Sequence, residues 1–424
     1  MMALENYLKY RSLMKGRSVE KFDLVIIGGG IFGCAIAYYY TKNNPEKQVV
    51  LLERNELNNA ATSRAAALMT MVRSKRAYIP LTIETFKVAK EMEVELGETL
   101  DFKEVGMMHV AASESKVRDL AKLMEIAKEY NQEAYYLTKE EAQNKTPWLK
   151  VDEALKIGFV PNEAYCDPYM LGTFFARCAK NRGAKIRLGV EVIGLIHDGG
   201  TVKGVKTSEA VIMAETVVDA AGVWAPLLAK EMGVGLPMAP VRSQYWITER
   251  ADIFPANSPM VLLPDAQAYA RPEGGGLLFG IREGKSLVAS PKDVPRDISD
   301  FVFSADEGME DLFENGERLA RFFPAIYDMG IKYYVAGFSG YTPDSQLVLG
   351  DVPGTKGFLV ASGCCGAGIS VAGGVGLGIA EMASGRPNPL DFSAFEISRF
   401  GDIDPFSEEW LNKCASSRSN KVSG

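Results

Sequence analysis

A glycine cluster near the start of the chain has the spacing that binds a pyrophosphate. Residues Gly28 to Gly33 read Gly-Gly-Gly-Ile-Phe-Gly and follow a short apolar run, 22–27, that predicts a strand. Gly28 permits a tight turn, Gly30 lets the backbone approach a pyrophosphate, and Gly33 lets the next helix pack closely on the strand. The free amides at the N-terminus of that helix favour an anion. A glycine-rich turn without a ligand is the alternative interpretation.

An acid at the expected distance supports the nucleotide interpretation. Glu53 ends a second apolar run twenty residues after Gly33, where its carboxylate can accept hydrogen bonds from ribose hydroxyls. The same carboxylate disfavours the extra phosphate of NADP, although Arg54 sits beside it. The strand before, the helix after and the acid at this distance together predict dinucleotide binding. NAD and FAD remain as candidates.

Three later segments decide between these two nucleotides. They carry small residues and hydroxyls suited to a long, flat ligand, which a nicotinamide dehydrogenase has no reason to carry. The segments are 60–68, 217–225 and 358–368. Together with the glycine cluster they resemble the D-amino-acid oxidase superfamily of flavoenzymes, which includes glycine oxidase, sarcosine oxidase and dimethylglycine dehydrogenase. The resemblance runs from about Phe22 to Phe400, and its motifs follow the order of the family.

Within this superfamily the chain is most similar to one branch. That branch contains sarcosine oxidase beta subunits, their dehydrogenase relatives and a mitochondrial FAD-dependent protein linked to complex I assembly. The similar segments are 269–272 (Tyr-Ala-Arg-Pro), 341–344 (Tyr-Thr-Pro-Asp) and 391–400. The resemblance implies an α/β (α+β) fold, in which a Rossmann-like FAD-binding domain carries a discontinuous substrate domain on a mostly antiparallel sheet.

The domains are expected to interleave along the chain. The FAD-binding domain comprises 22–100, 152–236 and 332–400, and the substrate domain comprises 101–151 and 237–331. Residues 1–21 form an N-terminal extension in which Leu4, Leu8 and Leu13 have near-helical spacing. Residues 401–424 form a C-terminal tail, which looks disordered after Phe406.

The resemblance also assigns residues to a non-covalently bound FAD. The first group holds the ADP half and pyrophosphate, Val192 meets the adenine through its backbone, and the C-terminal glycines cradle the flavin ring. A helix N-terminus there would favour the negative charge of the reduced ring. The assigned residues are Gly28, Gly30, Ile31, Phe32, Gly33, Glu53, Arg54, Thr62, Ser63, Arg64, Ala66, Ala67, Val192, Ala221, Gly222, Trp224, Gly340, Gly363, Cys365, Gly366, Ala367, Gly368 and Ile369.

The substrate site departs from its relatives at the carboxylate anchor. Glycine oxidase grips its substrate with an arginine where Ser339 stands here. Other arginines could replace it, and Arg271 is preferred because it lies on a predicted strand of the substrate domain. Tyr269 and Tyr341 are expected to line an aromatic pocket, with packing roles as the alternative. The remaining candidates are Arg73, Arg76, Arg242, Arg282 and Tyr245.

Two further departures concern the flavin. The cysteine that links FAD covalently in monomeric sarcosine oxidase is matched by Gly337, so that linkage is excluded here. The lysine that this relative uses for oxygen activation is matched by Leu278, which puts efficient oxidase activity in doubt. Cys364 and Cys365 fall near the expected flavin edge, where filling tight space is a simpler role than redox chemistry.

Composition excludes several other classes of protein. A formal net charge of −7 offers no basic field for nucleic acid. Six scattered cysteines and no signal-peptide pattern favour reduced thiols in a cytoplasmic protein. Only two histidines, His109 and His197, leave little for a metal site, and none is expected. The charge-free segment 357–380 is interpreted as strand, glycine turn and helix, not as a membrane span.

The predicted activity is oxidation of a small amine or amino acid related to sarcosine, glycine or proline. Hydride transfer to flavin would give an imine, which water hydrolyses, and such chemistry needs no strong acid–base pair. A FAD-dependent 2-hydroxy-acid dehydrogenase and a FAD-containing assembly or binding protein are the alternatives. The electron acceptor, O2 or another carrier, and the choice between homo-oligomer and hetero-oligomer stay open.

Overall fold

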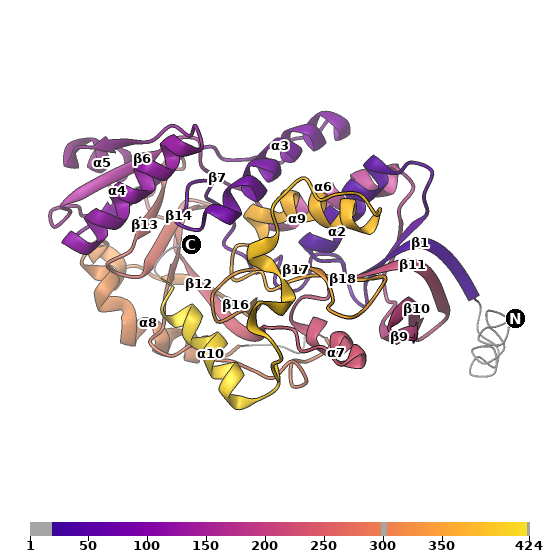
Figure 1. Cartoon of the computed structure of the whole chain (residues 1–424). Coiled ribbons are helices and arrows are strands. Elements are labelled where there is room, and N and C mark those ends of the chain that lie inside the picture. Colours follow the sequence, from indigo (N-terminus) through magenta and orange to yellow (C-terminus); the bar gives the residue numbers. More distant parts are fainter. Residues whose placement is uncertain (1–18, 298–302, 422–424) are drawn as a thin grey trace, which may run out of the picture.

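The computed structural model describes residues 19–297 and 303–421 and contains two sheets of eight strands each. The predicted leucine pattern before residue 19 lies outside the described residues. We call the two parts the parallel-sheet domain and the antiparallel-sheet domain. Figure 1 shows them side by side, with α2, α6, β1 and β11 in one and α4, α5, β6 and α8 in the other.

The parallel-sheet domain is built on the strand order β17-β18-β11-β1-β2-β8, with β10 and β9 attached beside β11. Strands β18, β11, β1, β2 and β8 run parallel, so their carboxyl ends meet at one edge. Their residues are apolar on both faces because helices and the β9–β10 hairpin cover the sheet. The strands are β1 (Val19–Ile27), β2 (Val49–Leu52), β8 (Lys185–Arg187), β9 (Val192–Asp198), β10 (Thr201–Thr207), β11 (Val211–Asp219), β17 (Val348–Asp351) and β18 (Phe358–Ser362).

Glycines let the C-terminal helix α9 (Gly368–Ala383) press against its neighbours. A methyl group added at Gly376 would lie 2.8 Å from the backbone carbon of Ala35, and one at Gly374 would lie 2.3 Å from Leu81 Cα. The other helices of this domain are α2 (Ile31–Asn43), α3 (Ile79–Leu96), α6 (Pro168–Asn181) and α7 (Ala225–Ala229). The strand, turn and helix predicted for 357–380 are therefore present. Within the described residues, no helix is long and apolar enough to cross a membrane.

The antiparallel-sheet domain has the strand order β16-β12-β15-β14-β13-β4-β6-β5, in which only the β13–β4 pair is parallel. Aromatic residues and leucines from this sheet and α8 form its core. The predicted fold class, with one parallel and one antiparallel sheet, is confirmed. The elements are β4 (Met107–Ala111), β5 (Tyr135–Leu137), β6 (Lys156–Val160), β12 (Ala239–Thr248), β13 (Met260–Leu263), β14 (Ala268–Glu273), β15 (Gly276–Ile281), β16 (Ile331–Tyr341), α4 (Glu114–Glu129), α5 (Lys139–Lys145) and α8 (Ala305–Ala320).

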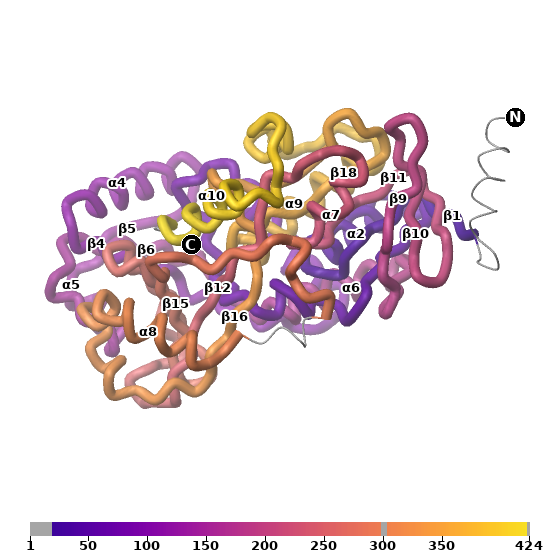
Figure 2. Tube along the Cα trace, turned by 90° about the horizontal axis from the view of Figure 1, so that it is seen from below, coloured from indigo at the N-terminus to yellow at the C-terminus, as the bar shows by residue number. Residues whose placement is uncertain are grey.

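The sheet membership of two strands differs from the domain bounds expected from the sequence. Strands β6 and β16 lie in the antiparallel sheet, although 152–236 and 332–400 were assigned to the FAD-binding domain. By sheet membership the antiparallel part therefore reaches further in both directions. Figure 2 shows β12 and β16 between the two ends of the molecule. Further short elements are β3 (Leu68–Met69), β7 (Ala164–Tyr165), η1 (Arg76–Tyr78), η2 (Gly222–Trp224), η3 (Lys230–Met232), η4 (Pro324–Tyr327), η5 (Ser393–Phe395) and η6 (Ile397–Phe400).

The C-terminal tail is helical over part of the range that was expected to be disordered. Residues Glu408–Ser419 form helix α10, which packs on β12 and β16. The Ser407 hydroxyl caps the helix by accepting the Trp410 amide hydrogen at 3.3 Å. Trp410, Cys414 and Arg418 recur every four residues and are buried as one stripe. The disorder prediction was wrong because serines and lysines between these residues hide the stripe.

Candidate functional site

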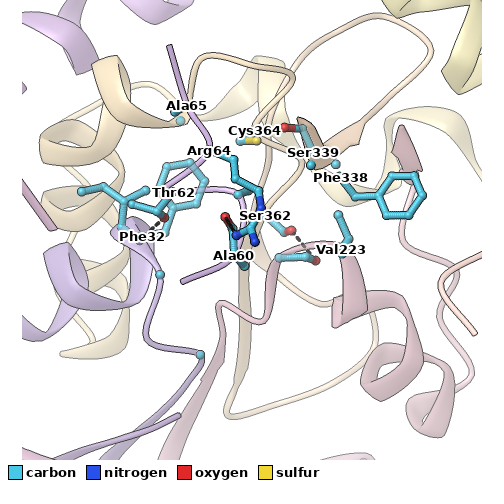
Figure 3. A pocket seen from close by; sticks show the side chains of 18 of the residues that line it. Phe32, Ala60, Thr62, Arg64, Ala65, Val223, Phe338, Ser339, Ser362 and Cys364 are labelled. Carbon is cyan, nitrogen blue, oxygen red and sulfur yellow. Dashed lines mark hydrogen bonds between the residues drawn. The ribbon is translucent and has the colours of Figure 1, made fainter. Parts of the chain in front are cut away.

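A cavity of about 610 Å³ opens at the carboxyl ends of the parallel strands and continues against the antiparallel sheet. Its walls come from the β1–α2 turn, segment 58–70, the end of β11, strands β12 and β16, and the β18–α9 turn. A ligand crevice at this edge of a parallel sheet is the usual position in open α/β folds. In Figure 3 the Arg64 side chain extends toward Ala60 and Ser362, with Thr62 beside Phe32.

The glycine cluster has the close contacts that its spacing predicts. Gly28 has a φ of +99°, and a methyl group there would lie 2.5 Å from the Ala220 carbonyl oxygen. A methyl group at Gly33 would lie 2.0 Å from the Gly28 carbonyl oxygen. The amide of Ile31, at the start of α2, donates to Thr62 Oγ1 at 3.1 Å. The turn therefore holds its amides beside the cavity in a shape that larger residues would break.

Glu53 is held by backbone amides at the end of β2. One carboxylate oxygen accepts from Gly29 N at 2.7 Å and the other from Asn55 N at 2.8 Å. The adjacent Arg54 guanidinium lies 4.1 Å from the centre of the Trp224 ring. Glu53, Arg54 and Trp224 all line the cavity together with Val192, where the resemblance places the nucleotide half of the ligand.

Most of the predicted cofactor residues line this cavity, and a few support it from behind. Gly33 lies beneath the turn, the Ser63 hydroxyl donates to Asn59 and Ala60 carbonyls, and Gly363 packs on Val348. Cys365 instead packs with Tyr341 and Trp410. The residues found in the wall are Gly28, Gly30, Ile31, Phe32, Glu53, Arg54, Thr62, Arg64, Ala66, Ala67, Val192, Ala221, Gly222, Trp224, Gly340, Gly366, Ala367, Gly368 and Ile369.

Sequence reasoning missed one wall of the cavity. Pro291, Lys292, Val294, Pro295 and Arg296 line it from the loop after β15. The loop carries two prolines but no glycine motif, so its only signal was its length between a strand and the next helix. Leu227, Leu228 and Gln244 were missed as well, because they belong to a helix and a strand whose orientation the chain alone does not reveal.

The wall contributed by the antiparallel sheet is aromatic and cationic. Tyr245, Tyr269, Arg282 and Ser339 line it. Gly280 makes room for Tyr269, since a methyl group at Gly280 would lie 2.4 Å from the phenol oxygen. Arg282 lies with its guanidinium carbon 5.6 Å from the centre of the Tyr269 ring. Burial raises the pKa of Tyr269, and it raises that of Tyr245 to about 12, so both hydroxyls stay protonated at neutral pH.

The predicted anchor Arg271 is engaged by the protein itself. Its guanidinium pairs with Glu273 at 2.5 Å and donates to the Ala66 carbonyl at 2.7 Å, and Arg271 is not among the residues that line the cavity. Tyr341 is 1% exposed and is also absent from the wall, with its hydroxyl 3.5 Å from Ser243 Oγ. Of the other candidate arginines, Arg242 pairs with Asp311 and Arg76 with Glu129. Of these candidates, Arg73 and Arg282 line the cavity, and no ion pair among the described residues includes either of them.

At the part of the cavity where the flavin ring is expected, the chain lacks the cysteine that links FAD covalently in a relative. A methyl group at Gly337 would lie 2.6 Å from Arg64 Cδ, so the Arg64 stem packs where a cysteine side chain would begin. Gly368 and Ile369, at the start of α9, line the same cavity as Ala367. An anionic ring would be stabilised there by the helix N-terminus.

The fold and the site together define a two-domain dinucleotide-binding oxidoreductase. The chain belongs to the FAD dependent oxidoreductase family, which it matches over residues 23–382. This match confirms the family resemblance and the prediction of FAD as cofactor. The glycine turn, the amide-held carboxylate and the cavity volume fit that group.

Individual relatives are similar over most of this chain. Sarcosine dehydrogenase from Homo sapiens is 30% identical over 92% of the chain and 43% of its own length. Dimethylglycine dehydrogenase from Homo sapiens is 27% identical over 90% of the chain and 45% of its own length. The chain therefore spans less than half of these relatives. Among solved structures, L-proline dehydrogenase from P. horikoshii has a TM-score of 0.80 at 25% identity, covering 90% of this chain and 98% of that one.

Proposed function

We propose that this chain oxidises a small amine or amino acid, using FAD as the electron acceptor of the chemical step. The observation that carries the proposal is the wall formed by Tyr245, Tyr269 and Arg282, which faces the same cavity as the α9 N-terminus. A carboxylate gripped by an arginine and flanked by phenols would place the neighbouring carbon beside the ring position. The names of the relatives, sarcosine and dimethylglycine dehydrogenase, support the same class of substrate.

The chain supplies positioning and charge more than proton transfer. Histidine is absent from the described residues that line the cavity, and the lining carboxylates, Glu53, Glu56, Glu191 and Glu231, come from the parallel-sheet domain. Nearby arginines disfavour an ammonium group, so a substrate amine would bind in its neutral form, which is the form that can lose hydride. Bound FAD supplies the two-electron oxidation, and the chain orients the substrate and excludes water.

The same proposal covers the acceptor that reoxidises the cofactor and the location of the protein. Leu278, 1% exposed in β15, stands where the resemblance places an oxygen-activating lysine, which favours a carrier other than O2. All six cysteines are unpaired, which supports a reducing, cytoplasmic location.

The test is anaerobic mixing of the FAD-loaded protein with a panel of small molecules while flavin absorbance is followed. The panel contains sarcosine, dimethylglycine, glycine, proline, D-amino acids and 2-hydroxy acids. Bleaching by an amine supports the proposal, and bleaching by hydroxy acids alone would replace it with the hydroxy-acid alternative. Repeating the reoxidation step with and without O2 then distinguishes an oxidase from a dehydrogenase.

A further inference from the structure

Three basic side chains from distant parts of the chain lie on or behind the cavity wall: Arg73 and Arg282 line the cavity, and Lys421 lines a second cavity that Arg73 shares. Arg73 follows β3, Arg282 follows β15, and Lys421 follows α10. We call them the cationic cluster. Lys421 Nζ donates to the Cys365 carbonyl at 2.9 Å and would lie 3.5 Å from a methyl group at Gly366, which lines the cavity.

Arg73 and Arg282 bring charge to the cavity wall itself. Arg73 Nη2 donates to Ser370 Oγ at 3.1 Å, on the first turn of α9, while its buried Nη1 has no hydrogen-bond partner. Arg73 also lines a second cavity of about 870 Å³, which Lys421 shares. Arg282 is 8% exposed and lines the main cavity. Two guanidinium groups, each more than nine-tenths buried, therefore have donors available for a ligand.

No carboxylate neutralises the cationic cluster. In the ranges 19–297 and 303–421, no ion pair includes Arg73, Arg282 or Lys421. Glu283, next to Arg282 in sequence, instead pairs with Arg418 at 2.5 Å, and both are buried. Glu163 lies near Arg73, but burial raises the pKa of its carboxyl to about 8, so it is largely protonated at neutral pH.

Buried like charges of this kind repel one another, and either loss of the Lys421 proton or a bound anion relieves the repulsion. Burial, together with Arg282, Lys75 and Arg73, holds the pKa of Lys421 well below its usual range. A negatively charged ligand would relieve both the repulsion and the lack of hydrogen-bond acceptors. Substrate binds before the flavin is reduced, so the negative charge available to the cluster is that of the substrate. One carboxylate at Arg282 leaves Arg73 and Lys421 for a second.

We propose, on the basis of the proposed amine oxidation, that the cationic cluster binds a second carboxylate of the substrate. The preferred substrates are then amino dicarboxylic acids or their N-alkyl derivatives, rather than the monocarboxylic amines that sarcosine represents. Arg73 and Lys421 set this preference, because Arg282 holds the first carboxylate, the buried Nη1 of Arg73 has no partner within the described residues, and Lys421 shares a cavity with Arg73.

Binding of dicarboxylates that cannot be oxidised tests the cluster without turnover. Malonate, succinate and glutarate are titrated against the flavin absorbance of the FAD-loaded full chain, with acetate and propionate as monocarboxylates. A charge-assisted hydrogen bond contributes about 1.5–3 kcal/mol. We therefore expect at least one dicarboxylate to bind about ten- to a hundredfold more tightly than acetate. Equal affinities would overturn the inference.

Variants locate the effect in the cluster. Lys421→Met should lose about tenfold or more in dicarboxylate affinity and leave acetate affinity within about twofold, whereas Arg282→Met should weaken both, because Arg282 holds the first carboxylate. Arg76→Met is the matched control, because its guanidinium is exposed and pairs with Glu129. Flavin content and melting temperature show whether each variant is folded, and Arg282→Gln replaces Arg282→Met if the latter is not. Unchanged dicarboxylate affinity in the folded variants would also overturn the inference.

The substrate panel separates the two proposals. Amino dicarboxylic acids, N-methylaspartate and iminodiacetate are added to the anaerobic bleaching experiment. Faster bleaching by these compounds than by sarcosine, glycine or proline supports both proposals. Faster bleaching by a monocarboxylic amine overturns the dicarboxylate preference and leaves amine oxidation standing. Tight dicarboxylate binding with no bleaching by any amine overturns amine oxidation instead.

Discussion

The Gly29 amide donates to Glu53 Oε2 at 2.7 Å, which joins the glycine turn to the end of the next strand. We predict that Glu53→Ala weakens FAD binding about ten- to a hundredfold, because it removes a charged acceptor from two backbone amides and from the ribose. Equilibrium titration of apoprotein with FAD measures the change. Glu46→Ala, at an exposed position before β2, should leave the affinity unchanged. Equal affinities for Glu53→Ala and the parent chain would contradict the assignment.

The cofactor should leave the protein when the chain unfolds. Gly337 offers no thiol, and the Arg64 stem packs against it. After acid precipitation we expect all yellow colour in the supernatant and an unmodified mass for the precipitated chain. Flavin retained in the pellet would show a covalent linkage at another residue and contradict the non-covalent prediction.

Two helical glycines, Gly376 in α9 and Gly316 in α8, allow a paired test of helix packing. Gly376→Ala puts a methyl group 2.8 Å from the Ala35 backbone, whereas the nearest atom to a methyl group at Gly316 in α8 lies 3.9 Å away. Overpacking costs about 1–3 kcal/mol, while alanine in an open helix position gains about 1 kcal/mol. Gly376→Ala should therefore lower the melting temperature and Gly316→Ala should raise it. A change of the same sign in both would contradict the packing argument.

Some parts of the fold and of the candidate site could be predicted from the sequence, and others could not. The strand, glycine turn and helix predicted for 357–380 are present as β18 and α9, because glycines mark the turn between two apolar stretches. The ion pair between Arg271 and Glu273 could also have been predicted, because the two residues are two positions apart on the same face of β14. The placement of Lys421 and Arg73 around one cavity could not be predicted, since it depends on how α10 returns to the antiparallel sheet.

Glu163 should make stability fall as pH rises. Its carboxyl is buried with a pKa of about 8, against 4.5 in the unfolded chain. Between these values the unfolded chain releases a proton that the folded chain keeps, so unfolding becomes easier with increasing pH, by at most about 1.4 kcal/mol per unit. Glu163→Gln keeps an acceptor for the Val72 amide and removes this loss. In denaturant unfolding from pH 5 to 8, the free energy of unfolding of the variant should rise relative to that of the parent chain. A constant difference between the two across this range would contradict the prediction.

Ligand binding at the cationic cluster should take up a proton. Lys421 faces Arg73, Lys75, Arg282 and the Cys365 thiol, and its pKa is depressed when no anion is bound. A bound carboxylate raises that pKa again, so binding protonates Lys421 wherever the pH lies between its two pKa values, and affinity falls as pH rises through this window. Calorimetry of dicarboxylate binding in buffers of different ionisation enthalpy measures the uptake. We expect a fraction of one proton for the parent chain and none for Lys421→Met, and the same uptake in both would show that another group carries the proton.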